Sequence, residues 1–160
     1  GNFPATRHIF SQWIEWKPPQ PAWQAYIRFE LRHHEYERAR QIYKRFVLVH
    51  PAVENWLAWA HFEEEENADA SSKQQRVAAT RSVFEQALEL LPDEKVHCVQ
   101  FFHEHAEFES RQQEYDRARV IYRFALDHIK SSEEAKQLYR HYISFEKRFG
   151  TTASIEEVLY

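Results

Sequence analysis

Apolar and aromatic residues recur along the chain at helical spacing, and one arrangement of them occurs four times. Each copy has an aromatic residue, a second ring three residues later, and Phe-Glu after three more. The four copies are Trp23-Tyr26-Phe29-Glu30, Trp56-Trp59-Phe62-Glu63, Phe102-His105-Phe108-Glu109 and Tyr139-Tyr142-Phe145-Glu146. Steps of three and four residues place side chains on one face of a helix. The pattern therefore predicts four related helices, which we call helix A.

A second helical pattern, helix B, is centred on an arginine. Around Arg40 the residues Ala39, Ile42, Tyr43, Phe46 and Val47 form one apolar stripe. The pattern returns around Arg81 with Phe84, and around Arg119 with Tyr122. Another copy, Thr6-Arg7-Ile9-Phe10-Trp13, has no helix A before it, so we expect the chain to open within a unit.

Recurring helix pairs predict an all-α fold, a right-handed α-α superhelix (solenoid) of antiparallel helix pairs like those of tetratricopeptide repeats. Prolines at 18, 19, 21, 51 and 92 separate the helices. We expect helices at 3–17, 20–33, 36–49, 52–67, 72–91, 95–111, 114–130 and 133–149, and a truncated one from about 153. Residues 1–160 then form one array: helix B of a truncated unit (3–18), a second unit (19–51), a third (52–92), a fourth (93–131) and a truncated fifth (132–160).

The third unit is longer than its neighbours. Glu63 and Arg81 are 18 residues apart, whereas Glu30 and Arg40 are 10 apart. The extra residues fall in 64–75. We expect one added turn in each arm of the hairpin, a capping box from Ser72 and Gln75, and a lip tipped by residues 67–71. Its acidic residues are ordinarily a solvated helix face, but they are also candidates for docking a basic partner segment: Glu64, Glu65, Glu66 and Asp69.

The glutamates and arginines of the two patterns have two interpretations, a ladder that binds a charged ligand or a structural ion pair. We favour the structural one, in which each arginine satisfies the carboxylate of its own hairpin: Glu30 with Arg40, Glu63 with Arg81 and Glu109 with Arg119. If such a pair is buried, Arg119→Ala should cost about 3–5 kcal/mol of stability.

The composition is typical of a soluble helical protein. It has 43% hydrophobic and 29% charged residues and a formal net charge of −4. No apolar run approaches the roughly 20 residues that span a bilayer. The single cysteine, Cys98, cannot form an internal disulfide, which fits a reducing compartment. We expect no membrane contact and no small-molecule substrate.

Enzyme and metal chemistry find little support in the motifs. The cluster His97, Cys98, His103 and His105 suggests a metal, but helical spacing directs His103 and His105 to different sides, and zinc ligands must converge. No phosphate-cradling glycine loop or nucleophile with an arranged base is present. We expect no cofactor, no metal and no catalysis.

Direct RNA binding is an open alternative. The candidate contacts form a basic strip on helix B and its turn: Arg38, Lys44, Arg45, Arg117 and Arg123. Phosphate binding relies on clustered cations, so the net charge of −4 argues against strong autonomous affinity.

The Trp-x-x-Tyr-x-x-Phe-Glu pattern, with Arg38-Ala39-Arg40-Gln41-Ile42-Tyr43 and Arg117-Ala118-Arg119-Val120-Ile121-Tyr122, resembles HAT (half-a-tetratricopeptide) repeats of RNA-processing proteins. Phe29-Glu30-Leu31-Arg32 with the run from Glu37 to Pro51, and the stretch Phe145-Glu146-Lys147-Arg148-Phe149-Gly150, are similar to the crooked-neck-like pre-mRNA splicing factors. The third unit departs from the pattern at Ala79-Thr80-Arg81.

The resemblance implies a non-catalytic protein-binding scaffold in the nucleus, part of the nineteen-complex set of the activated spliceosome. It further implies protein partners: a larger HAT-repeat protein and a Myb-domain splicing protein. Two alternatives stay open, a HAT array that binds RNA directly and a scaffold of 3′-end cleavage or ribosomal RNA processing.

Overall fold

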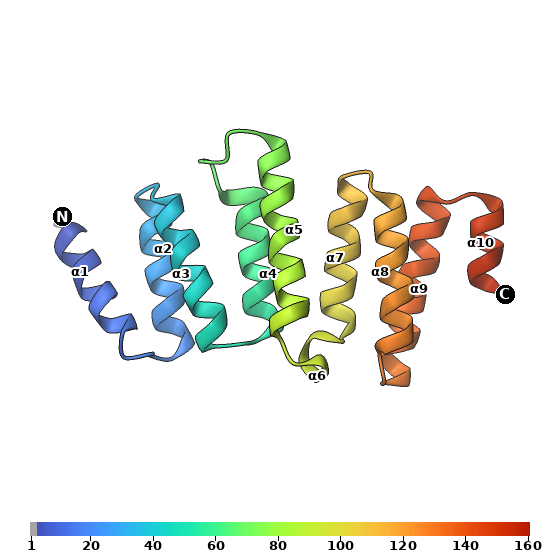
Figure 1. Ribbon diagram of the computed structural model, residues 1–160, viewed down its shortest axis with the longest axis horizontal. Coiled ribbons are helices and arrows are strands. Elements are labelled where there is room, and N and C mark those ends of the chain that lie inside the picture. Colours follow the sequence, from blue (N-terminus) through green and yellow to red (C-terminus); the bar gives the residue numbers. More distant parts are fainter. Residues whose placement is uncertain (1–2) are drawn as a thin grey trace. The chain divides into compact units, whose positions relative to one another are not determined.

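The computed structural model describes residues 3–160, and this range contains helices and connecting turns but no strand (Figure 1). The helices are α1 (Phe3–Ile14), α2 (Gln20–Arg32), α3 (Tyr36–Val49), α4 (Val53–His61), the π-helix η1 (Phe62–Glu66), α5 (Lys73–Leu90), α6 (Asp93–Val96), α7 (Val99–Arg111), α8 (Tyr115–His128), α9 (Ser132–Phe149) and α10 (Thr152–Leu159). The predicted all-α fold of repeated helices is confirmed.

The chain divides into two compact bodies, one ending at Ala87 and one starting at Leu88. We call them the N-terminal and C-terminal bodies and describe each by itself. In the N-terminal body α1 packs on α2, α2 on α3 and α3 on α4. In the C-terminal body α7 packs on α8 and α9, and α9 packs on both α8 and α10.

Most predicted helix boundaries lie within a few residues of the observed ones, but the helix expected at 95–111 is broken. Its first turn is the separate helix α6, and Cys98 has an extended backbone (φ −135°, ψ 157°) as the N-cap of α7. The β-branched residues Val96 and Val99 flank this break, and such residues lose side-chain freedom in a helix.

The connections α2–α3 and α7–α8 share one tight geometry. The amides of Glu35 and Glu114 donate to the carbonyl oxygens of Glu30 and Glu109, at 2.9 Å in both turns. The residue before each of them has a left-handed backbone, φ 57° at His34 and 61° at Gln113. This is the Schellman arrangement that ends many helices, so the signature glutamate anchors the turn through its backbone.

The long connection distributes its eight extra residues unevenly. Relative to the first hairpin, the arm after the signature glutamate gains one residue (Glu66 against Arg32), the loop gains three and the arm before Arg81 gains four. The prediction of one turn in each arm is thus correct for α5 and wrong for the first arm. That arm absorbs its extra residue in η1, where the amide of Asn67 donates to the Phe62 carbonyl at 2.9 Å.

The loop itself also differs from the expected lip. Asn67 is buried and its Oδ1 accepts from the Asp69 amide, so it closes the turn instead of tipping it. Ser72 accepts from the Gln75 amide, as a capping box requires, but the Gln75 side chain reaches the Ser71 amide instead of that of Ser72.

Helices α1 and α3 carry the same B pattern in different surroundings. Ile42 and Phe46 of α3 are buried, and the ring of Phe46 stacks on Trp23 of α2. Their counterparts on α1, Ile9 and Trp13, are 65% and 46% exposed. The apolar stripe of a B helix is therefore buried where a helix A of its own hairpin covers it.

Candidate functional site

The signature arginine and glutamate meet at the junction between consecutive repeats. Arg40 of α3 donates from Nε and Nη2 to the two carboxylate oxygens of Glu63, at 2.7 and 2.8 Å. Its third nitrogen donates to Glu37 at 2.9 Å. The carboxylate of Glu63 is almost fully buried, so Arg40 provides the paired charge that burial requires.

The same junction recurs in both bodies. Arg7 of α1 donates from Nε to both oxygens of the buried Glu30, at 2.9 and 3.2 Å. Arg119 of α8 donates to the two oxygens of Glu146 on α9, at 2.6 and 3.3 Å, and to Asp116 at 2.8 Å. Each observed pair thus joins a B helix to the A helix of the following repeat.

The expectation that each arginine pairs within its own hairpin is therefore wrong. Glu30 binds Arg7, and Arg40 binds Glu63. The backbone at Glu30 already ends α2 in a tight turn, and its carboxylate projects toward the preceding repeat. The sequence held a signal for this offset: Glu146 has no signature arginine on the following helix α10, whereas a shift by one repeat pairs it with Arg119.

Aromatic rings complete each junction beside the ion pair. The ring three residues after the arginine contacts rings of the next helix A. Phe10 lies 5.1 Å from Tyr26, Tyr43 lies 5.2 Å from Phe62, and Tyr122 lies 5.2 Å from Tyr142, measured between ring centroids. The recurrent residues of the sequence are thereby engaged between repeats, as packed aromatic rings and buried ion pairs.

Most signature side chains are accordingly buried. The buried ones are Trp23, Tyr26, Phe29, Glu30, Tyr43, Trp56, Trp59, Phe62, Glu63, Phe84, Phe102, Phe108, Glu109, Tyr122, Tyr142, Phe145 and Glu146. Arg40, Arg81, Arg119 and Tyr139 are half-buried. Among the described residues these positions leave little free surface for a ligand.

The junction of the C-terminal body has a marked electrostatic signature. Burial by itself raises the pKa of Glu146, but hydrogen bonds from Arg119 and Ser154 and the nearby positive charges outweigh it, so the pKa lies below its ordinary value. The hydrogen bond to Glu146 likewise raises the pKa of Arg119. Both groups are therefore held in their charged forms.

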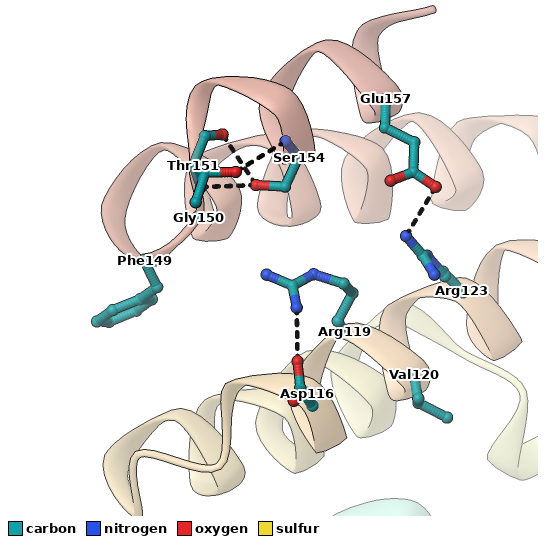
Figure 2. A pocket seen from close by; sticks show the side chains of 9 residues that line it. All are labelled: Asp116, Arg119, Val120, Arg123, Phe149, Gly150, Thr151, Ser154 and Glu157. Carbon is teal, nitrogen blue, oxygen red and sulfur yellow. Dashed lines mark hydrogen bonds and ion pairs between the residues drawn. The ribbon is translucent and has the colours of Figure 1, made fainter.

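A pocket of about 440 Å³ opens beside this junction (Figure 2). Its charged groups are paired: Arg119 with Asp116 at 2.8 Å and Arg123 with Glu157 at 3.1 Å. On the opposite side, Thr151 and Ser154 cap α10 by exchanging side-chain and backbone hydrogen bonds. Because its polar groups are satisfied within the chain, the pocket offers a ligand few free partners.

The histidines considered as metal ligands fall into separate surroundings. His103 stacks on His141, which belongs to none of the sequence motifs, with ring centroids 3.7 Å apart. His105 is buried next to Phe101. His97 lies against Phe102 and His128. Within residues 3–160 no three His, Cys, Asp or Glu side chains are arranged to hold a metal ion.

The acidic candidates lie on η1 and the turn after it. Glu64 is half-buried, whereas Glu65, Glu66 and Asp69 are exposed. His61 Nε2 lies 3.4 Å from Glu66. The exposed carboxylates are therefore available to a partner, next to the buried Glu63 of the junction.

The basic candidates mostly face carboxylates of this chain. Arg38 lies 3.8 Å from Glu35, Arg45 2.9 Å from Glu15, Arg117 4.0 Å from Glu114 and Arg123 3.1 Å from Glu157; Lys44 is exposed. Phosphate binding depends on cations that can neutralise the backbone. These neighbouring carboxylates offset four of the five candidate charges.

No helix within residues 3–160 combines the length and the apolar character that a bilayer crossing requires.

Paired helices, a repeated aromatic signature and ion pairs from one repeat to the next define a helical repeat protein. The family model of the HAT (Half-A-TPR) repeat matches residues 34–65. This range runs from the turn before α3 to η1 and includes both members of the Arg40–Glu63 junction. Over this stretch the chain is similar to the HAT-repeat proteins.

Relatives with curated names point to one group within them. The chain is 38% identical over 159 residues to "Pre-mRNA-splicing factor CLF1" of Yarrowia lipolytica, which is 96% of this chain and 22% of that protein. It is 44% identical over 54 residues to "Protein crooked neck" of Drosophila melanogaster, 34% of this chain and 8% of the relative. It is 46% identical over 69 residues to "Crooked neck-like protein 1" of Mus musculus, 43% of this chain and 9% of the relative. The chain thus spans about a fifth or less of these relatives and is similar to crooked-neck-like splicing factors.

Proposed function

We propose that the chain is a non-catalytic scaffold for protein–protein contacts in pre-mRNA splicing, acting in the nucleus. The supporting observation is its similarity to a named splicing factor over 96% of its length. The helical repeats add a physical reason, since their recurrent polar residues are engaged in the junctions and their remaining faces are long surfaces suited to binding.

The finer part of the proposal names the assembly and the partners. The chain acts within the nineteen-complex set of the activated spliceosome, where it contacts a larger HAT-repeat protein and a Myb-domain splicing protein. The exposed carboxylates Glu65, Glu66 and Asp69 are the candidate contact with a basic segment of a partner. They project from a long connection that is not part of the junctions.

A capture experiment tests this proposal. The immobilised chain is incubated with nuclear extract that has been treated with nuclease, and retained proteins are identified by mass spectrometry. We expect the two partner classes among the retained proteins. Recovery only without nuclease would replace the scaffold by RNA-mediated contact, and recovery of neither partner would contradict the proposal for this chain.

Matched variants locate the contact. Reversing the charge of Glu65 and Asp69 to lysine should reduce capture of the partner that carries the basic segment. The control reverses two exposed carboxylates of the C-terminal body, Asp127 and Glu133, and so makes the same change in net charge. Equal loss with both double variants would indicate a general charge effect and remove the assignment to the acidic connection.

A further inference from the structure

An open groove lies between α2 and α4 of the N-terminal body. Its volume is about 480 Å³, within the range of ordinary ligand sites. Buried side chains of Ile27, Tyr43 and Phe46 contribute to its lining. The polar and charged lining residues are Gln20, Gln24, Arg28, Glu54, Asn55 and Glu66.

The C-terminal body shows what occupies the corresponding place in another repeat. Gln24 and His103 both lie six residues before their signature glutamates, and Ala58 and His141 both lie five before theirs. Between α7 and α9 the two imidazole rings stack face to face, with centroids 3.7 Å apart and planes at 22°. The Tyr122 hydroxyl, equivalent to that of Tyr43, lies 3.4 Å from His103 Nδ1. Flat, nitrogen-containing groups beside the tyrosine hydroxyl therefore fill this place in the C-terminal body.

Glutamine and alanine at the two positions leave the corresponding place in the N-terminal body without rings. The groove beside Tyr43 thus suits a flat group that comes from outside the chain. A planar guanidinium has this form, and it also stacks on aromatic rings.

The charges that line the groove favour a positively charged ligand. The lining residues include two carboxylates, Glu54 and Glu66, against the single cation Arg28. Burial, followed by the negative charge of Glu66, raises the pKa of the Tyr43 hydroxyl to about 12. Glu66 therefore acts on the tyrosine that lines the groove. A guanidinium placed there would meet a carboxylate with which it can form paired hydrogen bonds.

We propose that the α2–α4 groove binds an arginine side chain of an extended segment of a protein partner. The guanidinium lies beside Tyr43, between Gln24 and Ala58, and faces Glu66. This inference rests on the proposed scaffold function and names the chemistry of one of its contacts.

Peptide titration tests the inference without any splicing protein. The ¹⁵N-labelled chain is titrated with acetyl-Gly-Gly-Arg-Gly-Gly-amide while the side-chain amide signals of Gln24 and Asn55 are followed by NMR. Both signals should shift. The analogue with citrulline, which has nearly the same shape without the charge, should bind at least about tenfold more weakly than the arginine peptide. Equal affinity for the citrulline peptide would overturn the assignment. Tighter binding of acetyl-Gly-Gly-Glu-Gly-Gly-amide, which could pair with Arg28, would overturn it as well.

Two variants separate the groove from the rest of the surface. Glu66→Gln changes an exposed side chain and should weaken binding of the arginine peptide about tenfold, whereas Glu65→Gln, outside the groove lining, should leave it unchanged. The double variant Gln24→His/Ala58→His introduces the histidines of the C-terminal body and should abolish binding at neutral pH. Unchanged affinity in Glu66→Gln or in the double variant would contradict the proposal.

The outcomes also distinguish this inference from the scaffold function. If the double variant folds, does not bind the peptide and still captures splicing proteins from extract, the groove binds arginine, but those proteins use another surface. If the wild-type chain captures the proteins but no peptide shifts the Gln24 signal, the scaffold stands and the arginine assignment is wrong.

Discussion

The grooves at α2–α4 and α7–α9 are equivalent places in two repeats, and they differ in what fills them. Both lie beside a tyrosine of the junction, Tyr43 or Tyr122. In the C-terminal body the stacked rings of His103 and His141 occupy the place, whereas the N-terminal body has Gln24 and Ala58 there and an open groove.

This difference teaches that a repeat has two kinds of position. Residues of the junction recur because a buried carboxylate needs its arginine and the rings need each other. Residues between consecutive A helices carry no such requirement, so they can differ from repeat to repeat without loss of the fold. Variation there gives repeats of one fold different surfaces.

The largest expected effect comes from removing the junction ion pair, which both bodies have in common. Arg40→Ala in the N-terminal body and Arg119→Ala in the C-terminal body should each lower the free energy of unfolding by about 3–5 kcal/mol, because each leaves a buried glutamate unpaired. Urea denaturation measures the loss. Arg117→Ala, at an exposed position, is the control and should change stability by less than about 0.5 kcal/mol. Small effects at Arg40 and Arg119 would show that the junctions are not held by their ion pairs.

A second substitution acts only on the C-terminal junction. A Cβ atom at Gly150 would lie 2.7 Å from the Glu146 carbonyl oxygen and would also meet the side-chain oxygens of Glu146 and Ser154. Gly150→Ala should therefore cost about 1–3 kcal/mol in a thermal melt. Thr152→Ala, at an exposed position of the same turn, is the control. A melting temperature of Gly150→Ala equal to that of the control would mean that a Cβ atom at this position does not disturb the packing around Glu146.

Acid should sharpen the contrast between the grooves, because only one of them contains a histidine pair. Burial, and then the charge of His103, lowers the pKa of His141, and the charge of Glu107 opposes this shift only in part. Above its ordinary pKa His141 is neutral in both folded and unfolded chains. As the pH falls below that value the unfolded chain binds the proton first, so the folded chain loses stability until His141 is also protonated in it.

Thermal melts of the wild type and His141→Ala between neutral pH and about pH 5 measure this effect. The stability of the wild type should fall more steeply with acidification. The difference between the two proteins should narrow as the pH falls. Parallel curves would show that the stacked histidines do not couple to folding.

The smallest expected effect concerns the turns that the two bodies have in common. His34 and Gln113 have left-handed backbones, which glycine adopts without the steric cost of a Cβ atom. Gln113→Gly should raise the free energy of unfolding by about 0.5 kcal/mol after the added entropy of the unfolded chain is subtracted. His34→Gly should gain less, because it also loses the contact of His34 Nδ1 with the Tyr36 hydroxyl. A loss of stability in Gln113→Gly, measured by urea denaturation, would contradict this account of the turns.

Much of the fold follows from the sequence because its strongest signals are local. The helix A copies and the prolines predict α2 and α3 nearly to the residue. The π-helix η1 does not follow, since one extra residue can enter a loop or a helix, and only the buried Phe62 and Glu63 favour the helix. Such a choice depends on packing partners that are distant in sequence.

The site is less predictable for the same reason. The signature predicts that Arg40 is structural, but the choice between Glu30 and Glu63 depends on which repeat the carboxylate faces. The stacking of His103 on His141 joins two helices separated by α8, and neither residue belongs to a periodic pattern. Contacts between helices that are not consecutive leave no local trace in a single sequence.

A double-mutant cycle tests the central claim, that the signature ion pairs join consecutive repeats. Arg40→Ala is combined with Glu63→Gln in one cycle and with Glu30→Gln in another, and unfolding in urea gives the coupling energies. We predict a coupling of about 1–3 kcal/mol between Arg40 and Glu63, and one within about 0.5 kcal/mol of zero between Arg40 and Glu30. Coupling to Glu30, or additive effects at Arg40 and Glu63, would contradict the claim.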